Sequence, residues 1–162
     1  MTVVVVLVLF VISAAVAAAV VVRSQKEKFA KDNEVVPGAA TTAPAEWAGA
    51  HTPEARLHRR LRDAVAALRA NPAMEDAWML EARVGLEQQA LTVDDRLIAV
   101  AALPERVRGE RMAAVAAAVD AVEEAVATFV TAPDQALQRT GVDRAMAEVA
   151  ERVAQLEQGG TF

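Results

Sequence analysis

The chain opens with an uninterrupted apolar run over residues 3–22. These twenty residues carry no charge, ten of them are valine, and Ser13 is their only polar side chain. In a helix they rise about 30 Å, the thickness of the hydrocarbon core of a bilayer. Valine favours strands in water, but a lone segment in lipid must satisfy its own backbone hydrogen bonds and becomes a helix. The pattern predicts a single transmembrane anchor over residues 1–23.

A cleaved secretory signal is the alternative interpretation of this run. Such signals begin with a basic segment, whereas no Lys or Arg precedes residue 3. Ala15 and Ala17 resemble a cleavage site, but the apolar residues 20–22 still follow them. These features favour a retained anchor in the cell membrane.

The charges that flank the run predict its orientation. Four basic residues follow it within nine positions, namely Arg23, Lys26, Lys28 and Lys31. The side of a transmembrane helix that is rich in Lys and Arg normally stays in the cytoplasm. We therefore expect the N-terminus outside and the rest of the chain in the cytoplasm.

Small side chains recur at helical spacing within the predicted anchor. Ser13 and Ala17 lie four residues apart, as do Ala14 and Ala18. Small residues at this spacing let a second transmembrane helix approach closely. The alternative is that alanine simply fills an apolar helix in an alanine-rich protein. These four residues are the candidates for packing within the membrane.

A basic juxtamembrane stretch and a segment rich in Pro, Ala and Thr follow, over residues 24–52. Pro37-Gly38 marks a turn, and Pro44 blocks a continuous helix. The composition predicts a tether between the bilayer and a domain. Trp47 is the large apolar residue of this tether. It either packs on the protein's own helices or anchors a partner, since Trp is enriched at interface hot spots.

From residue 53 onward apolar residues recur every three or four positions, the period of an amphipathic helix. Thr52-Pro53-Glu54 is a helix start, with a capping hydroxyl, a proline and an acid in the first turn. The pattern predicts helices over residues 53–70, 74–89, 92–101, 105–131 and 142–158, and a further turn of helix at residues 134–139. No segment alternates as a strand does. We therefore expect an all-α protein: one N-terminal transmembrane helix, a small four- to five-helix bundle at residues 53–158, and a tail at residues 159–162.

The fourth predicted helix carries the clearest apolar seam. Its members recur at spacings of three and four residues, as in coiled coils and bundles: Met112, Val115, Val119, Val122, Val126 and Phe129. The last predicted helix repeats this spacing, so the two are expected to form an antiparallel pair. Val and Ala bury less area than Leu or Phe. Such a thin core is marginal alone, and a bound partner would stabilise it.

Two resemblances add to this interpretation. Residues 67–89 resemble the junction between two tetratricopeptide repeats, through Asn71-Pro72, Ala77-Trp78, Leu80 and Gln88. No second copy follows, so this likeness implies a helix-turn-helix and no peptide groove. The overall plan is similar to small single-pass accessory subunits of bacterial membrane complexes, including those of actinobacterial respiratory supercomplexes. That likeness rests on architecture and an Ala/Val/Arg-rich style alone.

Candidate chemistry is sparse. The chain has no Cys and two His, His51 in the tether and His58 beside Arg59 and Arg60. Zinc needs three or four convergent ligands, and neither a catalytic triad nor a glycine-rich phosphate loop is visible. The net charge of −5 and pI near 5.1 lack the basic footprint of a nucleic-acid-binding protein. We expect no enzyme activity, no cofactor, no metal, no nucleic acid and no small-molecule substrate.

The strongest candidate site is the basic face of the first predicted helix, formed by Arg56, Arg59, Arg60, Arg62 and Arg69. Three interpretations remain open for it. It is a solvated face with internal pairs such as Arg59–Asp63, a surface for anionic lipid head groups, or a dock for an acidic surface. That acidic surface belongs either to a partner or to the chain's own C-terminal half.

These features together predict a non-enzymatic, membrane-anchored interaction protein. The expected partner is an integral membrane protein complex, which the chain would join as an accessory or stabilising subunit. The alternative is a tethered module that recruits a soluble acidic protein through the Arg-rich helix.

Overall fold

The computed structural model describes residues 33–71, 77–131 and 135–158. Within these ranges it contains a short 3-10 helix, η1 (Ala45–Ala48), and four α-helices: α2 (Pro53–Ala70), α3 (Ala77–Ala101), α4 (Glu105–Thr131) and α5 (Gln135–Gln158). They contain no strand, so the prediction of an all-helical bundle is confirmed for this part of the chain. None of the helices in these ranges is long and apolar enough to cross a bilayer. The predicted anchor, with Ser13, Ala14, Ala17 and Ala18, and the predicted tail at residues 159–162 lie outside the described residues.

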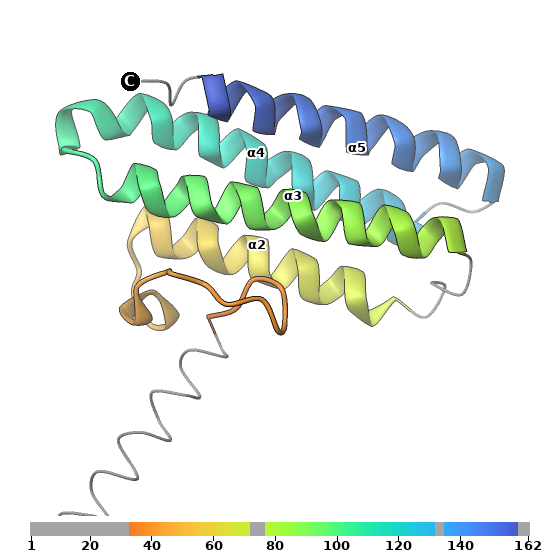
Figure 1. Cartoon of the computed structure of the whole chain (residues 1–162), viewed down its shortest axis with the longest axis horizontal. Coiled ribbons are helices and arrows are strands. Elements are labelled where there is room, and N and C mark those ends of the chain that lie inside the picture. The colour runs from red at the N-terminus through yellow and green to blue at the C-terminus, as the bar shows by residue number, and fades with distance from the viewer. Residues whose placement is uncertain (1–32, 72–76, 132–134, 159–162) are drawn as a thin grey trace, which may run out of the picture. The chain divides into compact units, whose positions relative to one another are not determined.

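The four α-helices lie side by side, and each runs antiparallel to the one before it (Figure 1). Helices α3 and α4 contact each other, and each of them also contacts α2 and α5. Helices α2 and α5 have no contact with each other in the described ranges. The bundle is therefore built around the α3–α4 pair, and the expected antiparallel pairing of the last two long helices is confirmed as α4 and α5.

Helix α2 begins and ends as its sequence predicts. The Thr52 hydroxyl accepts a hydrogen bond from the backbone N–H of Ala55 at 3.3 Å, and Pro53 occupies the first turn. At the other end, Asn71 Nδ2 donates to the carbonyl of Phe129 at 3.2 Å. This bond ties the end of α2 to the end of α4. Helices α2 and α3 also pack against each other.

Two predicted helix boundaries are wrong. Residues 92–101 do not form a separate helix, because α3 runs without a break to Ala101. The Thr92 hydroxyl donates to the Gln88 carbonyl within the helix, at 3.1 Å, in place of capping a new one. Val93 and Asp94 are buried, so tertiary packing overrides the weak local preference for a helix start.

The second wrong boundary separates the turn predicted at residues 134–139 from the helix predicted at residues 142–158, because α5 is continuous and Gly141 lies inside it. A Cβ at this position would lie 3.0 Å from the Cγ2 methyl of Thr128 on α4. The Thr128 rotamer is itself held by a hydrogen bond from its hydroxyl to the Glu124 carbonyl. The absence of a side chain at Gly141 therefore allows α4 and α5 to approach closely, and the residue does not terminate a helix.

The core follows the predicted seam. Its α4 members Val115, Val119, Val122, Val126 and Phe129 are buried, and Met112 is partly buried against them. Helix α2 contributes Leu57, Leu61, Val65 and Leu68. From α5, Val142 and Val149 are buried, while Met146, Val153 and Leu156 are partly buried.

Residues 33–52, expected as part of a tether, pack against the bundle and are called the strap here (orange in Figure 1). Val35, Val36 and Trp47 of the strap are buried in the same core as α2, α3 and α4. Of the two interpretations of Trp47, the structure therefore shows packing on the protein's own helices. The strap keeps few backbone hydrogen bonds of its own, such as Ala39 N–H to Val36 O and Trp47 N–H to Pro44 O, so its place depends on side chains of the bundle.

Candidate functional site

The Arg-rich face of α2 is engaged with the rest of the chain. Arg60 donates through Nε to Glu123 Oε1 at 2.9 Å and through Nη2 to Asp120 Oδ1 at 2.6 Å, both on α4. These hydrogen bonds, that with Glu123 above all, raise the pKa of Arg60. The Arg60 side chain is still 41% exposed, and exposed pairs contribute little to stability. Here the α2 face docks on the chain's own acidic half, one of the alternatives raised by the sequence.

Arg69 makes the more buried pair of this face. Its Nε and Nη2 atoms donate to the two carboxylate oxygens of Glu87 on α3 at 2.8 and 3.0 Å, and these bonds raise the pKa of Arg69. Glu87 is only 8% exposed. A planar guanidinium matches a carboxylate in this two-point geometry. The pair joins the end of α2 to the middle of α3.

The other three candidates lie in different settings. Arg59 Nη1 donates to the carbonyls of Trp47 and Ala50 at 2.8 and 2.6 Å, so it holds the strap and does not pair with Asp63 as expected. Asp63 accepts instead from its neighbour Arg62. Arg56 is exposed. The structure thus separates the five arginines into three that hold the fold together, one local pair and one exposed side chain.

A buried polar cluster beneath the strap is the most organised chemical feature of the bundle. Its centre is His58 of α2, which is fully buried. His58 Nδ1 lies 2.6 Å from Oδ1 of Asp94 on α3, and Nε2 lies 3.0 Å from the carbonyl oxygen of Asn33 in the strap. The Thr41 hydroxyl donates to the other carboxylate oxygen of Asp94 at 3.2 Å. We call Asn33, Thr41, His58 and Asp94 the His58 cluster.

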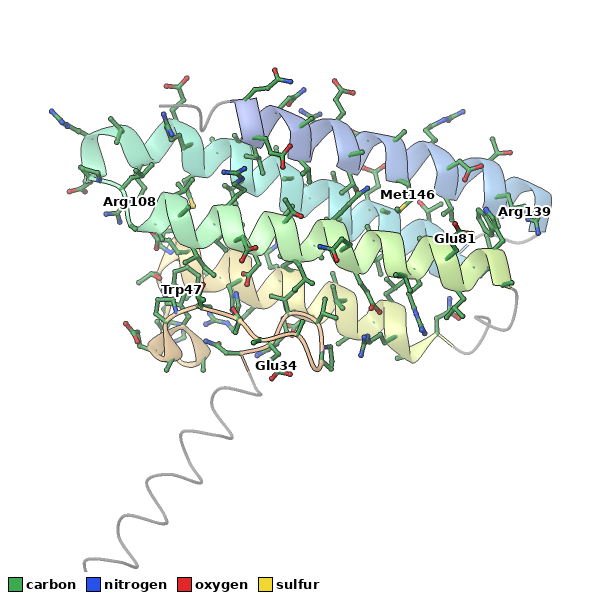
Figure 2. The ribbon with its side chains drawn as sticks, in the orientation of Figure 1. Glu34, Trp47, Glu81, Arg108, Arg139 and Met146 are labelled. Atoms are coloured by element: carbon green, nitrogen blue, oxygen red, sulfur yellow. The ribbon has the colours of Figure 1, made fainter. Side chains whose placement is uncertain are left out.

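Trp47 closes this cluster on one side. Its ring meets the His58 ring edge-to-face, with centroids 5.5 Å apart and planes at 63°. Figure 2 shows Trp47 at the end of the bundle where α2 begins, and Arg139, whose guanidinium lies 5.2 Å from the Trp78 ring centroid, at the opposite end. The cluster is therefore enclosed by the strap, α2 and α3, without exposed edges at His58.

Sequence reasoning missed the His58 cluster. His58 stands beside Arg59 and Arg60, which argues against a metal ligand, and Asp94 falls in the first turn of the helix predicted at residues 92–101. A signal was present, because His58, Leu61, Val65 and Leu68 recur at spacings of 3, 4 and 3 and so share one buried face. No pattern in α2 points to Asp94, which is 36 residues away.

The His58 cluster can hydrogen-bond the strap, but it presents no reactive atom. Both ring nitrogens of His58 and both carboxylate oxygens of Asp94 have hydrogen-bond partners. In the described ranges no three His, Cys, Asp or Glu side chains converge as metal ligands. What the arrangement does chemically is attach the strap to two helices at once.

A groove of about 430 Å³ runs between the strap and the ends of α3 and α4. Its walls are mostly apolar, with Trp47, Ile98 and Ala101 among them, and Glu54 and Arg108 stand at its polar side. Arg108 donates to the Leu103 carbonyl at 3.1 and 3.0 Å and lies 3.4 Å from Glu54. Arg108 is thus used to hold the α3–α4 connection.

Glu54 gives a pH-dependent prediction. Its pKa is below the ordinary value of 4.5, chiefly because its own backbone N–H donates to it, with further help from Thr52 and Arg108. A carboxylate stabilised in the folded state contributes stability above its ordinary pKa, and loses it as the pH falls through the lowered value. Glu54→Gln is therefore expected to cost about 0.3–1 kcal/mol at neutral pH, and the difference from wild type is expected to vanish as the pH falls through the lowered pKa of Glu54. Urea unfolding at a series of pH values measures it; a gap that stays constant on acidification contradicts it.

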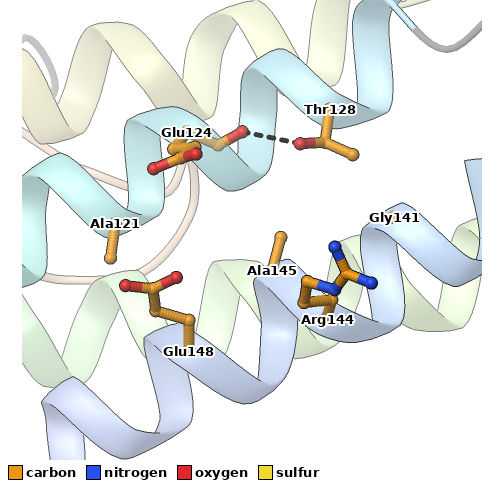
Figure 3. Close-up of a pocket in the computed structure, with 7 residues that line it drawn as sticks. All are labelled: Ala121, Glu124, Thr128, Gly141, Arg144, Ala145 and Glu148. Atoms are coloured by element: carbon orange, nitrogen blue, oxygen red, sulfur yellow. Dashed lines mark hydrogen bonds between the residues drawn. The ribbon is translucent and has the colours of Figure 1, made fainter.

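A second, smaller groove of about 200 Å³ lies between α4 and α5. Ala121, Gly141 and Ala145 leave it open because they are small, and Glu124, Arg144 and Glu148 border it (Figure 3). The dashed bond in this view is the contact from Thr128 to the Glu124 backbone within α4. No buried charged group points into the groove among the residues that line it, so it shows no built ligand site.

The described part of the molecule is thus a helical bundle whose polar side chains mainly bind one another. Its best-defined arrangement holds the strap to α2 and α3. Comparison of the chain with protein-family models, with curated proteins and with solved structures finds no match in any of the three.

Proposed function

We propose that this protein is a non-enzymatic, membrane-anchored interaction protein, an accessory or stabilising subunit of a larger membrane complex. The observation that carries the proposal is the apolar run at residues 3–22 joined to a small helical domain. The run has the length and composition of a transmembrane helix. The basic residues that follow it favour a cytoplasmic domain. A respiratory supercomplex of the actinobacterial type is the concrete candidate, on the likeness of overall plan.

The surface of the bundle supports a role in binding protein. Among the residues that the structure describes, three large apolar side chains are exposed: Leu80 and Val84, one turn apart on α3, and Val107 on α4. Single exposed apolar residues are common, but two that share a helix face offer a contact for a partner. The core of Val and Ala is thin, and association with a larger body stabilises such a domain by mass action.

The test is purification of the full chain from native membranes in mild detergent, followed by mass spectrometry of what co-purifies. We expect a defined set of membrane subunits to be recovered, and the double variant Leu80→Gln/Val84→Gln to lose a large part of them. Gln155→Ala, at an exposed position on α5, is the control away from this face and is expected to keep them. Recovery of the wild-type chain as a free monomer would contradict the proposal.

Topology is tested separately. The full chain is expected to stay with membranes after an alkaline wash, and its bundle is expected to resist protease added to intact cells stripped of their wall. Loss of the chain into the wash excludes the anchor. Cleavage from outside excludes the proposed orientation and leaves the anchor in place.

The alternative, recruitment of a soluble acidic partner through α2, has less support. Arg60 and Arg69 already bind carboxylates of the chain, and Arg59 binds strap carbonyls. Arg56 is exposed and takes no part in these bonds. Arg56→Glu therefore distinguishes the two functions: it leaves recovery of the membrane complex unchanged under the proposal, and abolishes partner binding under the alternative.

A further inference from the structure

The hydrogen bonds that attach the strap to the bundle require a fixed number of protons on His58 and Asp94. The Asn33 carbonyl can only accept a hydrogen bond, so His58 Nε2, 3.0 Å away, must carry a hydrogen. His58 Nδ1 and Asp94 Oδ1 are 2.6 Å apart, so a second proton must lie between them. Whether that proton belongs to an imidazolium facing a carboxylate or to an imidazole facing a carboxylic acid, the pair holds two. We propose that the strap is a proton-linked latch, closed while the His58–Asp94 pair holds two protons and released when it loses one.

Loss of one proton leaves a contact that the buried site cannot repair. Either Nδ1 and Oδ1 then face each other with lone pairs, or Nε2 faces the Asn33 carbonyl without a hydrogen. His58, Asp94 and Asn33 are at most 2% exposed, so water does not reach them while the strap is closed. A buried polar atom without a partner is costly. Opening the site to water removes this cost.

When the proton is lost, the strap moves, and α2 and α3 stay in place. His58 and Asp94 are fixed on two long helices that pack against each other, whereas Asn33 lies outside any helix. Asn33 also donates through Nδ2 to the Pro44 carbonyl at 2.9 Å, so its movement is passed to the residues before η1. Thr41, on the same strap, cannot replace the lost bond, because its hydroxyl hydrogen is already donated to the other oxygen of Asp94.

Asp94 is the charged group in contact with His58. On α2, Glu54 and Arg62 lie one turn to either side; Glu54 pairs with Arg108 of α4, and Arg62 with Asp63. Arg59 binds strap carbonyls. In the strap, Glu34 accepts from the Gly38 N–H, and Glu46 is exposed. Asp95 follows Asp94 on α3 and is exposed. The two protons are therefore held between His58, Asp94 and the Asn33 carbonyl.

Release frees the strap, residues 33–52, from the helices on which it packs. Twenty residues add up to roughly 70 Å of reach. Release also uncovers the apolar groups beneath Val35, Val36 and Trp47.

The test is hydrogen exchange of the full chain in detergent, followed by NMR from about pH 5 to pH 9, a range that spans the charge change of histidine. The probes are the backbone amides of Ala39, Trp47 and Gly49, whose bonds lie within the strap. Their protection factors, corrected for the intrinsic rate, are expected to fall by up to tenfold per pH unit, the slope for release of one proton. Amides in the middle of α4 are expected to stay constant. Strap protection that is flat with pH overturns the latch.

Asp94→Asn is the matched variant. Its amide Nδ2 donates to Nδ1 of a neutral imidazole, its Oδ1 accepts from Thr41, and Nε2–H stays on the Asn33 carbonyl. The cluster is then satisfied with no proton to lose, so the pH slope of the strap amides is expected to disappear. A slope that persists in this variant overturns the proposal. His51→Gln, which removes the other, exposed histidine, is expected to keep the wild-type slope, and its loss there also counts against the latch.

A measurement on the wild type covers the case in which Asp94→Asn does not fold. Nitrogen-15 NMR of the His58 ring is expected to show hydrogen on Nε2 and a shared or bound hydrogen at Nδ1 at the acidic end of the series. A ring that has an unprotonated nitrogen, with no shared proton, at that end overturns the proton count.

Discussion

Replacing Phe129 with alanine is expected to lower the free energy of unfolding by about 3–5 kcal/mol, the usual loss for a fully buried aromatic residue. Phe129 is 1% exposed and is the largest of the fully buried side chains. It lies near the end of α4, where its backbone carbonyl accepts from Asn71 at the end of α2 and from Gln138 of α5. The other buried residues of α4 and α5 are valines and alanines, which are too short and stiff to fill the cavity. Urea unfolding followed by circular dichroism measures the change.

Leu80→Ala is the control for this experiment. Leu80 is 45% exposed, so removal of its side chain is expected to change stability by less than about 0.5 kcal/mol. A loss below about 1 kcal/mol for Phe129→Ala would mean that the end of α4 is not packed as described, because a buried aromatic residue cannot be removed that cheaply.

Asp94→Ala is expected to be nearly as damaging, with a loss of about 3–5 kcal/mol at neutral pH. The variant leaves the buried His58 ring without the carboxylate that faces Nδ1, and leaves the Thr41 hydroxyl without its acceptor. Removing one member of a buried pair costs more than the pair itself contributes, since the other member stays buried without a partner. Denaturant unfolding at neutral pH measures the loss.

The double variant His58→Leu/Asp94→Ala separates the two causes of that loss. It removes both members of the pair, so it is expected to recover part of the stability lost by Asp94→Ala alone. If the free energy of unfolding of the double variant is lower still than that of Asp94→Ala, by as much as an ordinary core truncation costs, the two side chains are not coupled.

The helices that are long and strongly periodic could be predicted from the sequence, and the reason is local. The bounds of α2 follow from Thr52, Pro53 and Asn71, and those of α4 from Pro104 and an unbroken seam. Such signals act within a turn or two of the residue that carries them. At the predicted start of a helix at residue 92, the next residues Val93 and Asp94 are buried, and packing with α2 and the strap overrides the local preference.

The strap and the His58 cluster could not be predicted in the same way. Residues 33–52 have the composition of a tether, and only Val35, Val36 and Trp47 hint that they pack. The contacts that hold them join residues far apart in the chain, 25 positions for Asn33 and His58 and 53 for Thr41 and Asp94. A single sequence carries no periodic signal for such pairs. The Arg-rich face shows the same limit, since Arg60 finds its partners 60 and 63 positions later.

The strap is synthesised before the helices on which it packs, so it cannot fold when it is first made. Residues 33–52 leave the ribosome before α2, and well before Asp94 exists to receive Thr41. Contacts between such distant residues form late, because a long loop must close first. During synthesis Val35, Val36 and Trp47 therefore stay unburied until α3 has emerged. The earliest-made segment of the bundle is in this way the last of its N-terminal half to reach its native place, and its apolar residues are open to a chaperone until α3 has been made.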